Sequence, residues 1–96
     1  MTSLVIMRQY GYPVIFDGTH AVQQPSSLSG VTKGNRDMVP PLIRAALAVG
    51  VDGIFMEVHP NPDHAISDAA NQIRLADIQQ ILEQAKAFDE LAKRII

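Results

Sequence analysis

Two short apolar runs, each ending in polar side chains and each followed by a helical pattern, constrain the fold of this chain more than any other feature. The first run covers residues 14–16 and precedes Asp17 and His20. The second covers residues 53–58 and contains Glu57. Runs of Val, Ile and Phe of this length predict strands that are buried on both faces, as in a parallel sheet. Because ligands meet the carboxyl ends of such strands, the polar residues predict half of an active site.

Helical patterns surround both runs. Residues 4–9 predict the last turns of a helix, and residues 38–49 predict a second helix with Pro40 in its first turn and Gly50 just past its end. Residues 75–96 predict a third helix, whose apolar stripe is expected to pack in the core. The stripe consists of Ile78, Ile81, Leu82, Ala85, Phe88, Leu91 and Ile95.

The predicted order is therefore helix end, strand, helix, strand, helix, which is two βα units in series. The polar segments 23–35 and 59–74 are expected to be long loops. Two parallel strands alone leave both edges of a sheet unpaired and do not make a stable sheet. We therefore expect an α/β chain that forms one partial domain, residues 1–96, of a larger βα protein such as a (β/α)₈ barrel of about 250 residues.

Composition excludes several classes of function. The net charge is −2 and the basic residues are scattered, which argues against a nucleic-acid partner. The chain has no cysteine, so any metal must be bound by nitrogen and oxygen ligands. No apolar run approaches the roughly 20 residues of a membrane span. The start of the chain lacks the pattern of a signal peptide, so we expect a cytoplasmic protein without a membrane partner.

Several ordered motifs point to a specific family. They are Asp17-Gly18-Thr19-His20-Ala21-Val22-Gln23, Gly34-Asn35-Arg36, Gly53-Ile54-Phe55-Met56-Glu57-Val58-His59-Pro60 and Ser67-Asp68. Together they resemble the 3-deoxy-D-manno-octulosonate 8-phosphate synthase (Kdo-8-phosphate synthase) family, also called 2-dehydro-3-deoxyphosphooctonate aldolase. The resemblance covers residues 3–93 and matches only the C-terminal third of that enzyme, the last two βα units of its (β/α)₈ barrel.

The resemblance implies an enzyme of Kdo and lipopolysaccharide biosynthesis. It condenses phosphoenolpyruvate with D-arabinose 5-phosphate and water, giving the eight-carbon sugar acid phosphate and inorganic phosphate. One branch of the family uses a divalent metal, and Ser67 and Gln72 on either side of the third ligand position resemble that branch. The positions that match its metal ligands are His20, Glu57 and Asp68, with His20 and Asp68 also matching catalytic positions. The family implies a homotetramer, and this chain lacks the first-strand cysteine ligand and the rest of the barrel.

The chemistry of these residues agrees with the implied metal site. An imidazole and two carboxylates suit Zn²⁺, Fe²⁺ or Mn²⁺. Arg36, preceded by Gly34 and Asn35, matches the Gly-Asn-Arg segment of the family, where a guanidinium suits a phosphate or carboxylate. Gln23 is expected to hydrogen-bond sugar hydroxyls.

Three interpretations stay open. Asp17 has the chemistry either to contact substrate or to orient backbone or a ligand histidine. His59 is a candidate both for the site and for an ordinary loop residue, whereas His64 is expected at the surface. The chain itself is either part of a working synthase, completed by the missing part of the barrel, or a non-catalytic truncated remnant that at most binds a divalent cation.

Overall fold

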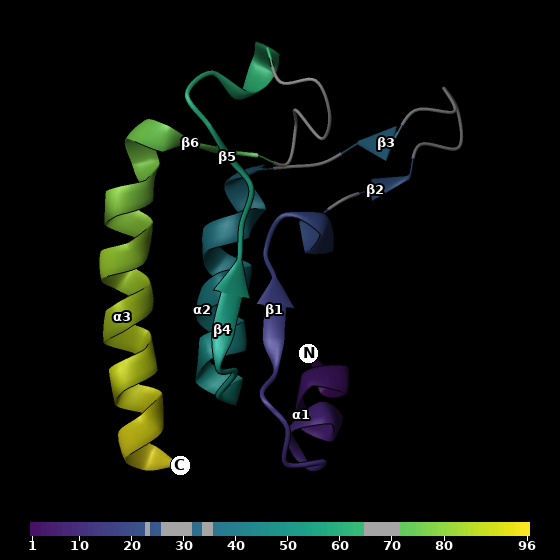
Figure 1. The fold of residues 1–96 in the computed structure, drawn as a ribbon, viewed down its shortest axis with the longest axis vertical. Helices are drawn as coiled ribbons and strands as arrows, with labels where there is room; N and C mark the ends of the chain where they lie inside the picture. The colour runs from purple at the N-terminus through teal and green to yellow at the C-terminus, as the bar shows by residue number, and fades with distance from the viewer. Residues whose placement is uncertain (23, 26–31, 34–35, 65–71) are drawn as a thin grey trace.

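The computed structural model describes residues 1–22, 24–25, 32–33, 36–64 and 72–96 (Figure 1). Its α-helices are α1 (Thr2–Arg8), α2 (Val39–Val49) and α3 (Ile78–Ile95). Its strands are β1 (Ile15–Asp17), β2 (Gln24–Pro25), β3 (Thr32–Lys33), β4 (Gly53–Phe55), β5 (Val58–His59) and β6 (Ile73–Arg74). Short 3₁₀ turns are η1 (His20–Val22), η2 (Arg36–Met38), η3 (Pro62–His64) and η4 (Leu75–Asp77).

Strands β1 and β4 form the parallel pair that the two apolar runs predict. Their register places Phe16 opposite Ile54 and Asp17 opposite Phe55. Helix α2 lies behind this pair, and α3 lies beside α2, with both helices running opposite to the strands (Figure 1). The predicted order of strand, helix, strand and helix is therefore confirmed.

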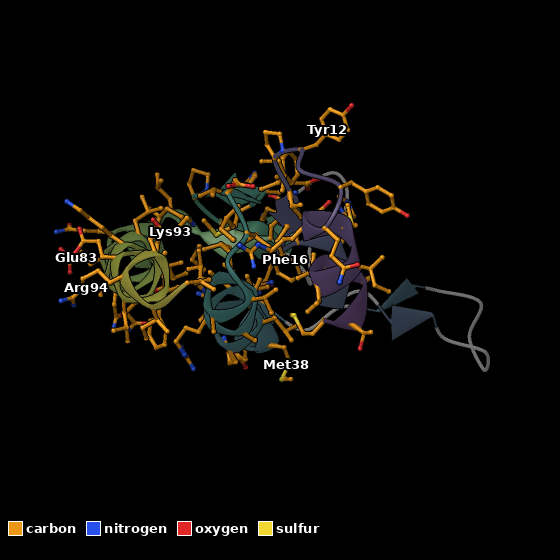
Figure 2. All side chains as sticks on the ribbon, turned by 90° about the horizontal axis from the view of Figure 1, so that it is seen from below. Tyr12, Phe16, Met38, Glu83, Lys93 and Arg94 are labelled. Atoms are coloured by element: carbon orange, nitrogen blue, oxygen red, sulfur yellow. The ribbon has the colours of Figure 1, made fainter. Side chains whose placement is uncertain are left out.

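The core lies between the β1–β4 pair and α2, and it extends to α3. Phe16 points into this layer, whereas Tyr12 projects away from the molecule (Figure 2). The buried apolar residues of this core are Leu4, Val14, Phe16, Val39, Ile43, Ala46, Leu47, Val51, Ile73 and Ile81. The opposite face of the sheet is open, because Ile15 is 57% exposed and Phe55 is 49% exposed.

Helix α2 begins and ends as its sequence predicts. Pro40 lies in the first turn, and Gly50 adopts a left-handed conformation (φ +104°) that ends the helix. Two cationic side chains then donate hydrogen bonds to carbonyls at this end: Arg8 to Val49 and Lys93 to Val51. These bonds attach α1 and α3 to the same end of α2, where a helix favours positive charge.

Four sequence expectations need correction. The two strands were expected to be buried on both faces, but one face of the β1–β4 pair is open. The segment 23–35 contains the short antiparallel pair β2–β3 rather than loop alone. The expected strand 53–58 breaks after Phe55, and its last part pairs as β5 with β6 within the expected loop 59–74. The α3 stripe is only partly buried: Ile81 packs in the core, but Leu82, Phe88, Leu91 and Ile95 are exposed, because among the described elements α2 is the main partner of α3.

No helix in the described part of the chain is both long enough and apolar enough to span a membrane.

Candidate functional site

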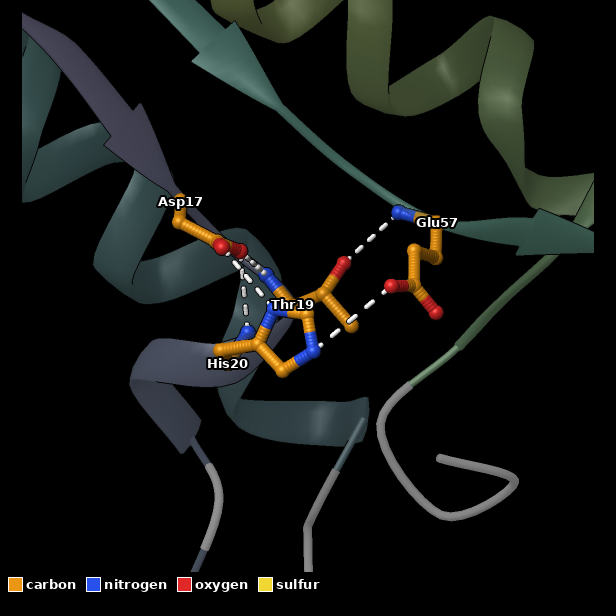
Figure 3. A network of polar contacts seen from close by, with 4 residues as sticks. All are labelled: Asp17, Thr19, His20 and Glu57. Carbon is orange, nitrogen blue, oxygen red and sulfur yellow. Dashed lines mark hydrogen bonds and ion pairs between the residues drawn. The ribbon is translucent and has the colours of Figure 1, made fainter. Parts of the chain in front are cut away.

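The ends of β1 and β4 bring four polar residues together (Figure 3). Asp17 is the last residue of β1, Thr19 follows in the turn, and His20 begins η1. Glu57 comes two residues after the end of β4. The two strands stay joined up to this point, because the Gly18 N–H donates to the Phe55 carbonyl at 2.8 Å. His20 and Glu57, predicted to meet from neighbouring strands, do so.

Asp17 organises the turn that carries His20. Its Oδ1 accepts hydrogen bonds from the backbone N–H groups of Thr19 and His20, each at 3.0 Å. Its Oδ2 lies 2.8 Å from the Nδ1 of His20. Because an ionised carboxylate only accepts hydrogen bonds, this contact favours the imidazole tautomer with its proton on Nδ1. Asp17 therefore orients both the backbone and the ring, which is one of the two roles left open by the sequence.

The other ring nitrogen of His20 faces Glu57. The Nε2 of His20 and the Oε1 of Glu57 are 3.6 Å apart, and both side chains are partly exposed. With the proton on Nδ1, Nε2 presents a lone pair towards the carboxylate. Two ligands about 2.1 Å from a tetrahedral cation lie roughly 3.4 Å apart, so this pair has the spacing and chemistry to share one divalent cation.

The described residues contain no group of three or more His, Cys, Asp or Glu side chains that could hold a metal. The predicted third ligand, Asp68, lies outside the described residues, as do Gln23 and Asn35. The structure thus brings together two of the three predicted ligands, with Asp17 behind the histidine as an orienting carboxylate. Carboxylates in this position commonly fix the ring of a metal-binding histidine.

The pKa of the Asp17 carboxyl follows from these contacts. Partial burial by itself raises this pKa, but the N–H groups of His20 and Thr19 and the His20 ring outweigh it, and the pKa lies below its ordinary value. A carboxyl whose pKa is lowered by folding stabilises the folded state above its unfolded pKa, and this contribution is lost as the pH falls through the folded pKa. The turn is therefore most stable above about pH 4.

This sign gives a testable pH dependence. We expect the Thr19 and His20 amides to be protected from hydrogen exchange at neutral pH and to lose protection below about pH 4. Asp17→Asn keeps an oxygen acceptor but cannot ionise. In this variant the Thr19 and His20 amides should be less protected at neutral pH, and their protection should not change with acid. Protection factors measured on both proteins across this range test the expectation. Parallel pH profiles for the two proteins would contradict it.

Arg36 lies elsewhere in the structure. Its Nη2 donates to the Oδ1 of Asp63 at 2.9 Å. It also lines a cleft of about 620 Å³ between the N-terminal ends of α2 and α3, to which Arg44 and Arg74 contribute. Neither His20 nor Glu57 is among the described residues that line this cleft.

The two other histidines, His59 and His64, are not part of the His20–Glu57 pair. The Nδ1 of His59 accepts a hydrogen bond from the Asn61 N–H at 2.9 Å, which makes His59 a loop-stabilising residue. His64 is exposed, as expected. Thr19 is one of the polar residues that end the first apolar run, but the sequence assigned it no role. It is completely buried, and its hydroxyl accepts the Glu57 N–H at 2.6 Å. Its position between two predicted site residues was the only signal.

Comparison with known proteins shows which family this chain matches. The sequence model of the DAHP synthetase I family matches residues 1–94. The 2-dehydro-3-deoxyphosphooctonate aldolase of Magnetococcus marinus is 55% identical over 93 residues, which are 97% of this chain and 32% of that protein. The same-named proteins of Legionella pneumophila (strain Lens) and Fusobacterium nucleatum are each 52% identical, covering 98% and 99% of this chain and 34% of each relative. The predicted resemblance is confirmed, and the chain spans about a third of the length of these curated relatives.

Solved structures agree with this result. The phospho-2-dehydro-3-deoxyheptonate aldolase (DAHP synthase) of Thermotoga maritima matches with a TM-score of 0.73 and 34% identity, covering 98% of this chain and 24% of that chain. A truncated form of the 3-deoxy-D-arabino-heptulosonate 7-phosphate synthase of the same organism matches with the same TM-score and identity, and the match covers 31% of its chain.

Proposed function

Because the chain belongs to the DAHP synthetase I family, we propose that it forms the C-terminal third of a Kdo-8-phosphate synthase, the last two βα units of a (β/α)₈ barrel. The complete enzyme condenses phosphoenolpyruvate with D-arabinose 5-phosphate and water to give 3-deoxy-D-manno-octulosonate 8-phosphate and phosphate. Relatives at 48–55% identity, all named as this aldolase, support the assignment. They do not favour the alternative of a non-catalytic remnant.

The observation that carries the proposal is the His20–Glu57 pair at 3.6 Å. In the proposed site, His20 and Glu57 contribute two ligands of a divalent cation of the Mn, Fe or Zn class, and Asp68 contributes a third. When bound, the cation supplies Lewis acidity for a substrate carbonyl or a water. Asp17 holds the Nδ1 proton of His20 and so keeps the Nε2 lone pair directed at the site.

The substrate-binding residues remain part of the proposal. The guanidinium of Arg36 suits a phosphate or carboxylate group. It lines a cleft with two further arginines, Arg44 and Arg74, and with the carboxylates of Asp37 and Asp77. The carboxylate of Asp63 already accepts a hydrogen bond from Nη2 of the Arg36 guanidinium, so an anion at this nitrogen would compete with it. Asn35, Gln23 and the catalytic role of Asp68 rest on the resemblance. So do a homo-oligomeric state and a cytoplasmic location.

A hybrid barrel tests the proposed function. The matching third of the Magnetococcus marinus relative is replaced by this chain, and phosphate release from phosphoenolpyruvate is measured with arabinose 5-phosphate and Mn²⁺. We expect turnover within about tenfold of the parent enzyme, a barrier difference of about 1.4 kcal/mol. A hybrid that folds like its parent but releases no phosphate would contradict the proposal.

The isolated chain serves as the control. We expect it to release no phosphate above background under the same conditions. Holding two phosphorylated substrates in line supplies up to about 7–11 kcal/mol of the barrier reduction in such reactions. The described residues offer one cluster of guanidinium groups for anions and no second one. Chelator-sensitive turnover by the isolated chain would mean that more of the site lies within these 96 residues than we propose.

A further inference from the structure

Thr19 occupies an unusual position between the two candidate metal ligands. Its side chain is completely buried, although it is polar. Its hydroxyl oxygen accepts the backbone N–H of Glu57 at 2.6 Å, across 38 residues of sequence (Figure 3). Its own N–H donates to Asp17, the residue that orients His20. Thr19 is thus bonded to both sides of the site.

The bond replaces one that a regular sheet would make. The Gly18 N–H donates to the Phe55 carbonyl as the last backbone bond between the two strands. Continuing the evenly spaced ladder of parallel strands would pair the Glu57 N–H with the Gly18 carbonyl. It would then pair the His20 N–H with the Glu57 carbonyl. Side chains take both places, because the Thr19 hydroxyl accepts from Glu57 and the Asp17 carboxylate accepts from His20.

Using side-chain acceptors in place of backbone carbonyls has two consequences for the site. The chain after β1 turns into η1, so the His20 side chain is carried to the strand end rather than continuing the sheet. The Glu57 carbonyl is left to accept the Ile73 N–H at 2.9 Å, at the start of the β5–β6 pairing. The Glu57 backbone is therefore fixed at its N–H by Thr19 and at its carbonyl by Ile73.

We propose that Thr19 is a positioning residue that sets the separation of His20 and Glu57 and thereby the cation affinity of the pair. The proposal rests on the proposed function, because it assigns the cation to these two side chains. The hydrogen bonds described for Thr19 involve the Glu57 N–H and the Asp17 carboxylate rather than the His20 ring or the Glu57 carboxylate. The Thr19 side chain acts through the main chain of Glu57. The hydrogen bond from its backbone N–H to Asp17 would remain in every Thr19 variant of the test.

A purely structural role makes a different prediction. If Thr19 only fills space, then replacing it by valine, which has nearly the same shape, should change stability but not cation affinity. Under that hypothesis, Thr19→Val should affect cation affinity no more than Val51→Ala, a core substitution at the other end of the strands. Val51 is completely buried and precedes β4, so it is a matched control for lost stability.

The test compares Thr19→Val, Thr19→Ser and Val51→Ala in the complete 96-residue chain and in the hybrid barrel. Mn²⁺ affinity is measured by titration, and Co²⁺ absorption reports the geometry of the site. We expect Thr19→Val to weaken Mn²⁺ binding by about tenfold or more, as substitutions of residues that orient metal ligands commonly do. Thr19→Ser keeps the hydroxyl and should retain the affinity and the Co²⁺ spectrum, as should Val51→Ala. If Thr19→Val does not fold, Thr19→Cys, with its weak acceptor, takes its place.

Equal affinities of Thr19→Val and Val51→Ala would overturn the proposal. Absence of cation binding in the unsubstituted hybrid would instead reject the proposed cation site, whereas phosphate release by the hybrid tests the synthase function separately. Hydrogen exchange of the Glu57 amide then tests the positioning role of Thr19 without any metal. Loss of its protection in Thr19→Val but not in Thr19→Ser supports the positioning role, and unchanged protection overturns it.

Discussion

Replacing His20 by alanine in the hybrid barrel is expected to lower metal-dependent turnover by about a thousandfold, the upper end of the loss seen when one preorganised electrostatic group is removed. The expectation follows from the direction of the ring. Asp17 binds Nδ1 at 2.8 Å, and Nε2 faces Glu57 at 3.6 Å, a separation that suits two ligands of one cation. Alanine removes this ligand and leaves the Glu57 carboxylate without its partner. Phosphate release with and without chelator is the measurement.

His64→Ala is the matched control, because His64 is exposed on η3 and the described contacts do not place it at the site. It should leave turnover unchanged. Asp68→Ala is expected to behave like His20→Ala, since Asp68 matches the third ligand of the family. Full activity of the His20→Ala hybrid would remove the metal assignment itself. Equal loss in His20→Ala and His64→Ala would indicate damage to the fold rather than to the site.

The sequence was sufficient to predict the elements that local rules decide. Helix α2 was predicted within one residue at its start, because Pro40 suits a first turn and Gly50 suits a left-handed end. Strands β1 and β4 were predicted from short apolar runs rich in Val, Ile and Phe, whose length and β-branched residues favour a strand over a helix. Their parallel pairing follows from the helix between them.

The break in the second strand could not be predicted in this way. Its cause is a pairing across 38 residues, in which Thr19 takes the Glu57 N–H. No local pattern in residues 53–58 signals it. The burial of the α3 stripe was overestimated for a related reason. An apolar stripe tells which residues avoid water but not which partner covers them, and α2 covers only the part around Ile81.

The candidate site shows the same division. His20 and Glu57 were predicted from polar residues at the ends of two strands, and the structure brings them together. The choice between the two roles of Asp17 needed the 2.8 Å contact to the His20 ring. The substrate role of Arg36 came from the resemblance, and the structure adds the cleft and the contact between Asp63 and Nη2 of Arg36.

The isolated chain is expected to self-associate rather than to remain a monomer of 10.5 kDa. Strands β1 and β4 pair only with each other among the described residues, so the outer edge of each is open. Open edges and an exposed apolar face favour association with further chains. Here Ile15 is 57% exposed and Phe55 is 49% exposed on the same face of the pair. Sedimentation velocity and size-exclusion chromatography with light scattering measure the outcome.

A paired substitution identifies the surface responsible. Ile15→Lys with Phe55→Lys places charge on the open face and should shift the isolated chain towards monomer. Tyr12→Lys changes a residue that is 78% exposed but lies outside the β1–β4 pair, so it should leave the association unchanged. A sharply melting monomer of the unsubstituted chain would contradict the expectation.

The same lysines should have the opposite effect in the hybrid barrel. In the proposed (β/α)₈ barrel the open face of β1 and β4 becomes the interior, where two buried, unpaired ammonium groups would each cost several kcal/mol. We therefore expect Ile15→Lys with Phe55→Lys to prevent the hybrid from folding, while Tyr12→Lys is tolerated. Improved behaviour of the isolated chain together with loss of the hybrid would identify this face as the one that the rest of the barrel covers. If the hybrid tolerates both lysines, the face lies outside the barrel interior, and the proposed place of β1 and β4 in the barrel is wrong.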